Sequence, residues 1–304
     1  MSYVRFALLV LTLAALAGCG GGDQARTPTP VPPGVPARIA LIVLENHEAS
    51  QVTGSKQTSY LSALGRRYAE SSDGHALTHP SLPNYIALVA GRTAGITNDC
   101  VPSRCSVPGR SLVDQLEEAG VSWRAYMESM PRPCFHYAGD ELGRYAQRHN
   151  PFAYLTRVWR RPERCNKVVP LSRLRGDTRS GLARFSWITP NLCHDMHDCG
   201  AAAGEAWLRR TVPPLLRALG PRGLLIVTFD EGTTDAGCCG NAAGGRIVTV
   251  LAGAGARRGA VSNVPVDHYS TLATVEAVLG LPRLAGAGSA PVLSSLLAPG
   301  LVPR

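Results

Sequence analysis

The sequence carries little charge, and its charged residues are not gathered into runs. Of its 304 residues, 17% are charged and 45% are hydrophobic. This composition excludes an intrinsically disordered chain and predicts a globular fold. The densest basic segment, residues 157–167, contains five Arg and Lys residues separated by other residue types. Such spacing is more typical of a solvated surface than of a stripe that binds nucleic acid.

Nucleic-acid-binding motifs, internal repeats and internal linkers are also missing. We find no helix-turn-helix, zinc-finger or RNA-binding signature, so no nucleic-acid partner is expected. The net charge of +9 still favours anionic partners such as phosphate esters or acidic lipid headgroups. Because no linker divides residues 37–304, we predict that they form one domain with a sizeable core.

The cysteines show no C-x2-C pair, which argues against a cysteine zinc site. Eight of the nine cysteines follow Cys19, and an even number in an exported chain suggests disulfides. Cys238 and Cys239 are adjacent and hard to join to each other, so we expect at least one of them to pair elsewhere. The connectivity is therefore left open. The pairs that are local in sequence are Cys100–Cys105, Cys134–Cys165 and Cys193–Cys199.

The first 36 residues are expected to be a targeting segment and a tether. Residues 6–16 are apolar, long enough for a signal peptide and too short to span a bilayer. The following Leu16-Ala17-Gly18-Cys19 resembles the lipobox of bacterial lipoproteins, in which cleavage leaves a lipid-bearing cysteine, here Cys19. The alternative is an ordinary secretory signal with a chance cysteine. Residues 20–36 are rich in Gly, Thr and Pro and predict an extended tether.

These features predict an exported bacterial lipoprotein. It would lie on the extracytoplasmic face of a membrane, either periplasmic or at the cell surface, and its membrane contact would be the N-terminal lipid anchor. The oligomeric state is left open.

From residue 38 onward, strand-like and helix-like segments alternate, which predicts a mainly parallel sheet with helices on both faces. The stretch 128–182 is irregular, carries two cysteines, and is expected to be an insertion or cap over one end of the sheet. The expected strands are 38–44, 122–126, 184–188, 223–229 and 247–252. The expected helices are 58–72, a second helix that has Pro83 near its start and runs to Gly91, 111–119, 205–219 and 268–279.

Polar residues follow two of the buried strands directly. Glu45-Asn46-His47-Glu48 comes after strand 38–44, and Asp230-Glu231 comes after strand 223–229. Ligand sites of open α/β sheets lie at the carboxyl ends of their strands. Two adjacent buried carboxylates repel each other unless a cation or an arginine compensates. The pattern therefore indicates a site for a positive group.

Three further clusters bring histidines, carboxylates and a serine: residues 79–84, 194–198 and 267–270. This mixture suits a divalent cation and a hydroxyl nucleophile that the cation activates. Ser81 would open a helix, where backbone N–H groups attract anions. Structural roles are alternatives: Ser81 or Asp267 as helix N-caps, and residues 195–198 as a turn held by flanking cysteines.

Taken in order, these motifs resemble the bacterial phosphoesterase family that includes acid phosphatases and phospholipases C, within the alkaline phosphatase superfamily. The resemblance spans nearly all of residues 38–280. It implies an alkaline-phosphatase-like α/β fold, with a disulfide-bearing insertion, that hydrolyses phosphate esters. The matching stretches are 45–46, 80–85, 123–127, 148–152, 189–193, 195–198, 229–232 and 268–276.

The resemblance also implies roles for single residues. Ser81 would be the nucleophile, and Asn46 and Asn84 would bind the phosphoryl group. His197 and His268 would assist at the leaving group or at a second metal. His47 and Glu48 lie outside the match and are expected to support the site or to face solvent. The implied metal ligands are Glu45, Asp195, Asp230 and Glu231.

The implied reaction has two steps, attack by Ser81 on a small phosphorylated substrate and hydrolysis of the phosphoserine by water. The cofactor would be a divalent metal ion, with Mg, Mn, Ca, Fe and Zn all left open. After Asp230-Glu231 the chain reads Gly-Thr-Thr-Asp-Ala-Gly where the longer phospholipases have Gly-x-x-Asp-His, which weakens a lipase assignment. The alternatives are a phospholipase C or other phosphodiesterase, and a non-catalytic surface lipoprotein.

Overall fold

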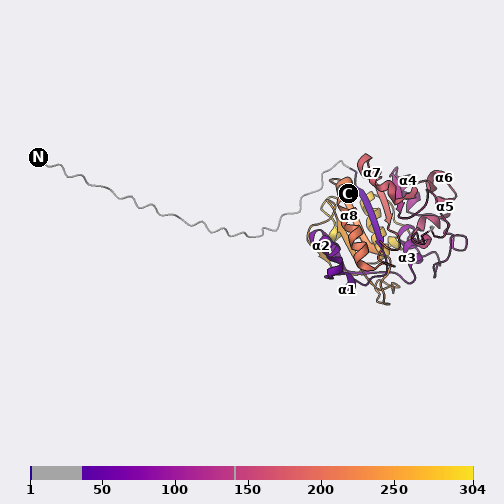
Figure 1. Ribbon diagram of the computed structural model, residues 1–304, viewed down its shortest axis with the longest axis horizontal. Helices are drawn as coiled ribbons and strands as arrows, with labels where there is room; N and C mark the ends of the chain where they lie inside the picture. Colours follow the sequence, from indigo (N-terminus) through magenta and orange to yellow (C-terminus); the bar gives the residue numbers. More distant parts are fainter. Residues whose placement is uncertain (2–35, 140–141, 304) are drawn as a thin grey trace.

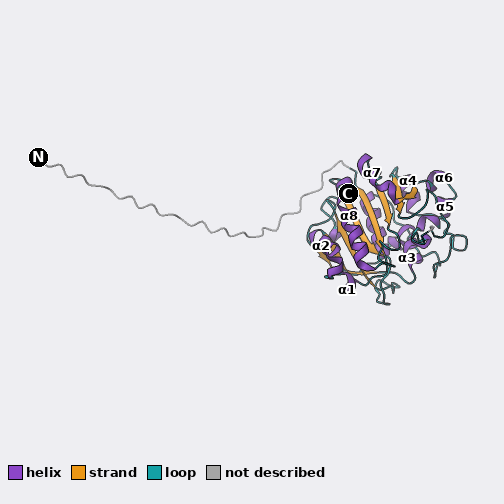
Figure 2. Ribbon diagram, in the orientation of Figure 1, coloured by secondary structure: helices purple, strands orange, loops and turns teal. Residues whose placement is uncertain are grey.

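The computed structural model describes residues 1, 36–139 and 142–303. The targeting segment, Cys19 and most of the tether predicted above lie outside the described residues. Figures 1 and 2 show a central sheet with helices packed around it. The strands are β1 (Arg38–Leu44), β2 (Ala69–His75), β3 (Trp123–Met127), β4 (Val168–Pro170), β5 (Phe185–Thr189), β6 (Gly223–Phe229), β7 (Arg246–Ala252) and β8 (Ala260–Ser262).

Nine α-helices occur in the described residues, most of them short. They are α1 (Ala49–Val52), α2 (Ser59–Arg67), α3 (Ser81–Ala90), α4 (Leu112–Glu118), α5 (Thr156–Trp159), α6 (Pro162–Cys165), α7 (Leu174–Ser180), α8 (Gly200–Leu219) and α9 (His268–Leu279). None of them is long and apolar enough to cross a bilayer.

The sheet has the strand order β4-β3-β5-β1-β6-β7-β2-β8. Only β7 runs against its neighbours β6 and β2, and the other described pairings are parallel. The predicted mainly parallel α/β sheet is confirmed. As a result, the carboxyl ends of β1, β2, β5 and β6 meet at one edge of the sheet.

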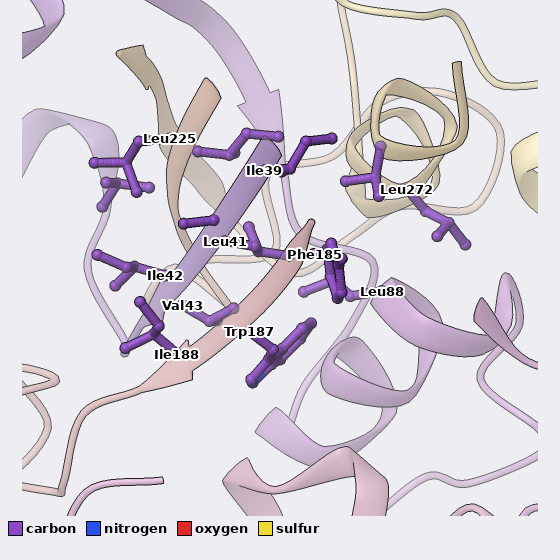
Figure 3. Close-up of a cluster of buried hydrophobic side chains, with 14 of the residues drawn as sticks. Ile39, Leu41, Ile42, Val43, Leu88, Phe185, Trp187, Ile188, Leu225 and Leu272 are labelled. Carbon is purple, nitrogen blue, oxygen red and sulfur yellow. The ribbon is translucent and has the colours of Figure 1, made fainter. Parts of the chain in front are cut away.

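The core explains why β1 occupies the middle of the sheet. Six of its seven residues are buried, and they alternate between the two faces (Figure 3). Leu41 packs with Trp187 of β5 and with α3 on one face, while Ile42 lies with Ile188 and Leu225 on the other. A near-continuous apolar strand is what a parallel sheet covered on both sides requires.

One expected helix proved wrong over part of its length. We predicted a helix over 58–72, but α2 ends at Arg67 because Tyr68 leaves the helical region (φ −112°, ψ −97°). The next seven residues form β2, whose pairing with β7 shifts register between Ser71 and Gly74. The segment Ala-Glu-Ser-Ser-Asp-Gly-His has almost no apolar residues, so only its neighbours in the sheet make it a strand.

The described cysteines all form disulfides. Three pairs are the local ones, Cys100–Cys105, Cys134–Cys165 and Cys193–Cys199. The expectation for Cys238 and Cys239 was wrong, because they are bonded to each other. Cys239 has a φ of +53°, a left-handed conformation that is uncommon for a residue other than glycine.

Candidate active site

Three carboxylates meet at the carboxyl edge of the sheet because each follows a neighbouring parallel strand. Glu45 follows β1, Asp230 follows β6, and Asp195 lies in the loop after β5. Backbone hydrogen bonds continue the sheet at this point. The Glu45 N–H donates to the Asp195 carbonyl at 2.8 Å, and the Asp230 N–H donates to the Leu44 carbonyl at 2.8 Å. All three acidic residues are fully buried.

Ser81 is brought to the same edge by the connection between β2 and α3. It is the first residue of α3, and its hydroxyl donates to Glu45 Oε2 at 3.2 Å. Tyr85, one turn later, donates its hydroxyl to Glu45 Oε1. The N-cap position belongs to Pro80, which has no capping side chain, and the first-turn N–H of Leu82 donates instead to Asp99 Oδ1 at 3.0 Å. The hydroxyl of Ser81 therefore faces the carboxylates instead of capping the helix.

His149 joins this group from the insertion, and the sequence analysis gave it no role. Its Nδ1 lies 3.3 Å from Glu45 Oε1 and 3.3 Å from Asp195 Oδ2. Its ring stacks on Tyr85, with 5.2 Å between the centroids. Potential ligand atoms of Glu45, His149 and Asp195 all lie within 4.8 Å of one another. The match of residues 148–152 to a family motif was the signal that could have found it.

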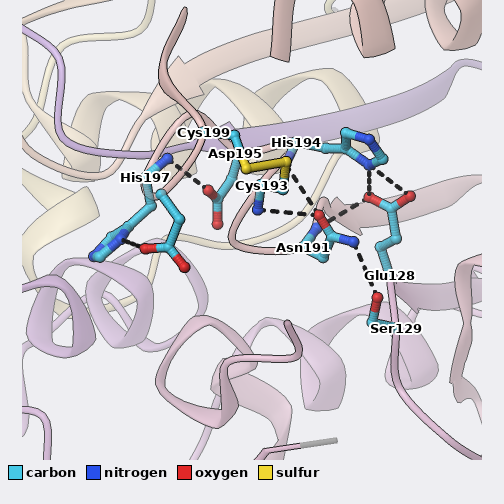
Figure 4. The surroundings of a disulfide bond; sticks show 9 residues. Glu128, Ser129, Asn191, Cys193, His194, Asp195, His197 and Cys199 are labelled. Atoms are coloured by element: carbon cyan, nitrogen blue, oxygen red, sulfur yellow. Dashed lines mark hydrogen bonds and ion pairs between the residues drawn. A yellow bond between two sulfur atoms is a disulfide. The ribbon is translucent and has the colours of Figure 1, made fainter. Parts of the chain in front are cut away.

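Asp195 is held in a short loop that the Cys193–Cys199 disulfide closes (Figure 4). Its Oδ1 accepts from the His197 N–H at 2.8 Å. The ring of His197 is partly exposed, with Nδ1 2.6 Å from Asp198 and Nε2 3.4 Å from Arg148. The loop thus turns Asp195 inward and leaves His197 at the rim of the site.

Asn46 and His268 surround Asp230. The backbone N–H of Asn46 donates to Asp230 Oδ1 at 3.2 Å. Asn46 has a φ of +51°, a conformation that asparagine tolerates better than most residues. The fully buried His268 lies at the start of α9, with Nε2 2.5 Å from the Asp230 carbonyl oxygen. Both residues lie beside Asp230, and their predicted roles stay predictions.

Glu231 and Asn84 are turned toward the loop that precedes Ser81. Glu231 Oε2 lies 2.8 Å from Nδ1 of His79. The Asn84 side chain accepts from the N–H groups of Leu77 and Thr78 and donates to the Thr78 carbonyl. Asn84 therefore holds this loop in place. The predicted contacts of Glu231 with a metal and of Asn84 with a phosphoryl group stay predictions.

Glu48 is buried rather than solvent-facing. Its carboxylate accepts from the backbone N–H groups of Thr233, Thr234 and Arg246 at 3.0–3.1 Å. The chain can approach this closely because glycines flank the carboxylate. A Cβ on Gly232 would lie 2.4 Å from Glu48 Oε1. Glu48 thus ties the loop after Glu231 to the end of β1.

Residues 45–282 match a family model that is described as "Phosphoesterase family". The chain belongs to this phosphoesterase family. The match confirms the predicted resemblance, and the phosphatase names of its relatives support its assignment as a phosphoric ester hydrolase.

Two of these relatives show how much of the chain is shared. A protein of Mycobacterium tuberculosis named phosphatidylinositol-3-phosphatase is 33% identical over 86% of this chain and 82% of its own length. An acid phosphatase of Aspergillus fumigatus is 28% identical over 90% of this chain. The chain spans only 62% of the fungal protein.

Solved structures support the fold assignment. A protein of the alkaline phosphatase superfamily from Vibrio parahaemolyticus superposes with a TM-score of 0.58 at 10% identity, covering 90% of this chain and 79% of the other. A phosphonate monoester hydrolase from Silicibacter pomeroyi gives a TM-score of 0.50 at 11% identity, with 85% and 76% covered. The alkaline-phosphatase-like fold expected from the sequence is confirmed.

Burial makes this phosphoesterase site strongly unfavourable for negative charge. Burial, together with the charges of Asp230 and Asp195, raises the pKa of Glu45 well above its usual range. Burial raises the pKa of Asp195 to about 7. Burial and the neighbouring Glu231 raise the pKa of Asp230 to about 8. Burial also lowers the pKa of His149 well below its usual value, so this imidazole is neutral and adds no positive charge.

The donor atoms of the site fit a divalent cation. Buried polar atoms usually have a hydrogen-bond partner, but several here have none: Asn46 Oδ1, Asp195 Oδ2, Asp230 Oδ2, and both ring nitrogens of His149. His149 Nδ1 lies at ion-pair distance from two carboxylates without hydrogen-bond geometry. Carboxylates with a neutral imidazole are the ligands that Mn, Fe and Zn ions take. A cation would neutralise these charges and use these atoms.

Proposed function

We propose that this phosphoesterase hydrolyses phosphate monoesters through a phosphoserine at Ser81. One observation carries the proposal. The Ser81 hydroxyl opens α3 and donates to Glu45 inside a buried group of carboxylates. A structural serine would cap the helix or bond to backbone, whereas this one is placed among groups that need a cation. The names of both relatives, as phosphatases, support the monoester as the substrate class.

The cation would be held by Glu45, His149, Asp195 and Asp230. When bound, it supplies positive charge that acidifies the serine hydroxyl and stabilises the phosphoryl oxygens. His149 was not among the predicted ligands, and its contacts with two of the carboxylates support its inclusion. Glu231 remains a candidate ligand, and its contact with His79 would hold the loop that carries Ser81.

The residues of the chain divide the proton transfers between them. Glu45 Oε2 already accepts the Ser81 hydrogen bond, so it is placed to take the proton as Ser81 attacks phosphorus. His197 lies at the rim, where it can give a proton to the departing alcohol. Arg148 lies between His197 and Asp99, with its Nε 3.4 Å from Asp99. Its guanidinium would bind a phosphoryl oxygen of the substrate at the mouth of the site.

The test is the turnover of an aryl phosphate monoester by Ser81→Ala. We expect kcat to fall by at least about 10³-fold, because the covalent step is lost. Ser71→Ala is the matched control. Ser71 is also buried, but it lies within β2 and its hydroxyl has no hydrogen-bond partner, so its removal should leave kcat unchanged. Full activity in Ser81→Ala would refute the nucleophile.

The substrate class is tested separately with an aryl phosphate monoester, an aryl phosphate diester and phosphatidylcholine vesicles. We expect the monoester to be hydrolysed with the highest kcat/KM. Faster release of phosphocholine from phosphatidylcholine would instead favour the phospholipase C alternative and would leave the role of Ser81 unaffected.

We also propose that the chain is an exported protein anchored by a lipid on Cys19. The support is the lipobox resemblance in the sequence together with disulfides at all the described cysteines. Expression in bacteria fed with radiolabelled palmitate tests it. The wild-type chain should be labelled and Cys19→Ser should not, whereas equal labelling of both chains would contradict the anchor.

A further inference from the structure

A groove of about 640 Å³ lies between α7 and the C-terminal half of α8. Apolar side chains such as Leu174 and Pro214 form part of its lining. Four exposed arginines complete it, two from each helix: Arg175, Arg179, Arg210 and Arg217. The groove therefore combines an apolar lining with four guanidinium groups.

The positive charge of this groove is not compensated. No acidic side chain lines it. Within residues 36–139 and 142–303, none of its four guanidinium groups forms an ion pair. The nearest acid along α7, Asp177, is engaged by Arg124 at 2.7 Å and by the Tyr126 hydroxyl at 2.8 Å. The four charges are thus available to an anionic partner.

The groove lies toward the edge of the sheet at which the described chain begins. α7 and α8 lead into β5 and β6, and both strands start beside the first residues of β1. The Ile39 N–H donates to the Arg184 carbonyl at 2.8 Å, and Arg38 is in register with Gly223. Figure 1 shows α7, the end of α8 and the start of β1 together. The catalytic carboxylates lie one strand length away, about 20 Å.

We propose that this arginine groove docks on the anionic phospholipid headgroups of a membrane. Charge complementarity is one reason, since clustered arginines are attracted to the negative surface of such a membrane. The length of the preceding chain is the other. Residues 19–36 span at most about 60 Å when fully extended, so an anchor at Cys19 keeps this edge of the domain within reach of the bilayer.

This orientation has a consequence for the proposed function. With the groove on the lipid surface, the edge that carries Ser81 and Glu45 faces away from the bilayer. Substrate would then approach from the aqueous side, as a soluble ester or as an ester presented by an opposing surface.

The test is co-sedimentation with vesicles of the mature Cys19→Ser chain, which begins at residue 19, lacks the apolar residues 6–16 and cannot be acylated at residue 19. One set of vesicles is pure phosphatidylcholine, and the other contains about 30% of the anionic lipid phosphatidylglycerol, which gives the vesicle a negative surface potential. The groove variant replaces Arg175, Arg179, Arg210 and Arg217 by Gln. The control removes the same charge at exposed arginines outside the groove: Arg104, Arg132, Arg160 and Arg161.

Each arginine near an anionic surface contributes about fivefold to partitioning. We expect the groove variant to bind the anionic vesicles at least tenfold more weakly, and the control to change by less than about twofold. Replacement of the same four arginines by Lys should keep most of the binding. Raising the salt from 0.05 to 0.5 M should abolish the difference, since surface charges are then screened.

Three outcomes would overturn the proposal. The first is an equal loss of binding in the groove and control variants. The second is equal binding to neutral and anionic vesicles. The third is tight binding to a soluble polyphosphate with no preference for anionic vesicles, which would assign the groove to a soluble polyanion. The groove variant should hydrolyse a soluble aryl phosphate at the wild-type rate, because its four arginines lie away from the Ser81 site.

Discussion

Removal of the divalent cation should make the stability of this protein fall as pH rises above neutrality. Glu45, Asp195 and Asp230 are fully buried together, and the pKa of Asp230 is raised to about 8 and that of Glu45 well above its usual range. Without a cation, the folded state therefore keeps protons that the unfolded chain has already released. A raised carboxyl pKa in the folded state means that stability declines with pH up to that pKa.

The magnitude follows from the number of protons held. The pKa values of buried His149 and His268 are lowered, so below about pH 6.5 these histidines make stability rise with pH. The effect of the carboxylates alone is therefore measured between about pH 6.5 and 8. One proton held by the carboxylates changes the free energy of unfolding by about 1.4 kcal/mol per pH unit. Over this window the loss is about 2 kcal/mol, which corresponds to a fall in Tm of roughly 4–8 °C for a domain of this size.

The assay is thermal unfolding at pH 6.5, 7.25 and 8.0, in excess chelator or in saturating Mn²⁺. In chelator, Tm should fall across the series. In Mn²⁺ the carboxylates are ionised and paired, so Tm should stay level and the gap between the two conditions should widen with pH. Asp230→Asn is the control. It should reduce the fall of Tm with pH in chelator, and it should reduce the difference in Tm between Mn²⁺ and chelator. A Tm in chelator that is constant or rises with pH would refute the reasoning.

Three further changes test the supports of the site. His149→Ala should weaken Mn²⁺ binding by at least about tenfold, measured by titration calorimetry, whereas unchanged affinity would remove His149 from the site. Glu48→Ala should cost about 3 kcal/mol in urea unfolding, because three backbone N–H groups lose the carboxylate that accepts from them. A loss below about 1 kcal/mol would contradict this role. Replacing Cys193 and Cys199 by Ser should cost about 2 kcal/mol and lower kcat with little change in KM. An unchanged kcat would contradict the role of the disulfide in holding Asp195.

Much of the site could be predicted from the sequence because the carboxyl ends of parallel strands share one edge. The buried runs before Glu45 and Asp230 are strongly apolar, so their ends are easily recognised. Once both strands are placed in one parallel sheet, these carboxylates must lie near each other. The place of Ser81 at the start of a helix is clear from the apolar residues that follow it, whereas its role as nucleophile is implied by the family resemblance.

The parts that were missed depend on contacts between distant residues. His149 lies in the irregular insertion, where no periodic pattern shows which side chain turns inward. For Glu48 the sequence left open a supporting role or exposure to solvent, because the backbone N–H groups that bind it come from residues 233–246. The first four residues of β2, 69–72, were taken for helix because this polar sequence becomes a strand only through pairing with β7 and β8.

The most direct test of the central claim is to trap the phosphorylated enzyme. The protein is mixed with an aryl phosphate, quenched in acid within the first turnover, digested, and examined by mass spectrometry. The proposed reaction predicts one added phosphoryl group on Ser81, absent from Ser81→Ala and present in Ser71→Ala. Hydrolysis of the substrate at the wild-type rate by Ser81→Ala, with no phosphoryl group on any residue of the wild type, would contradict it.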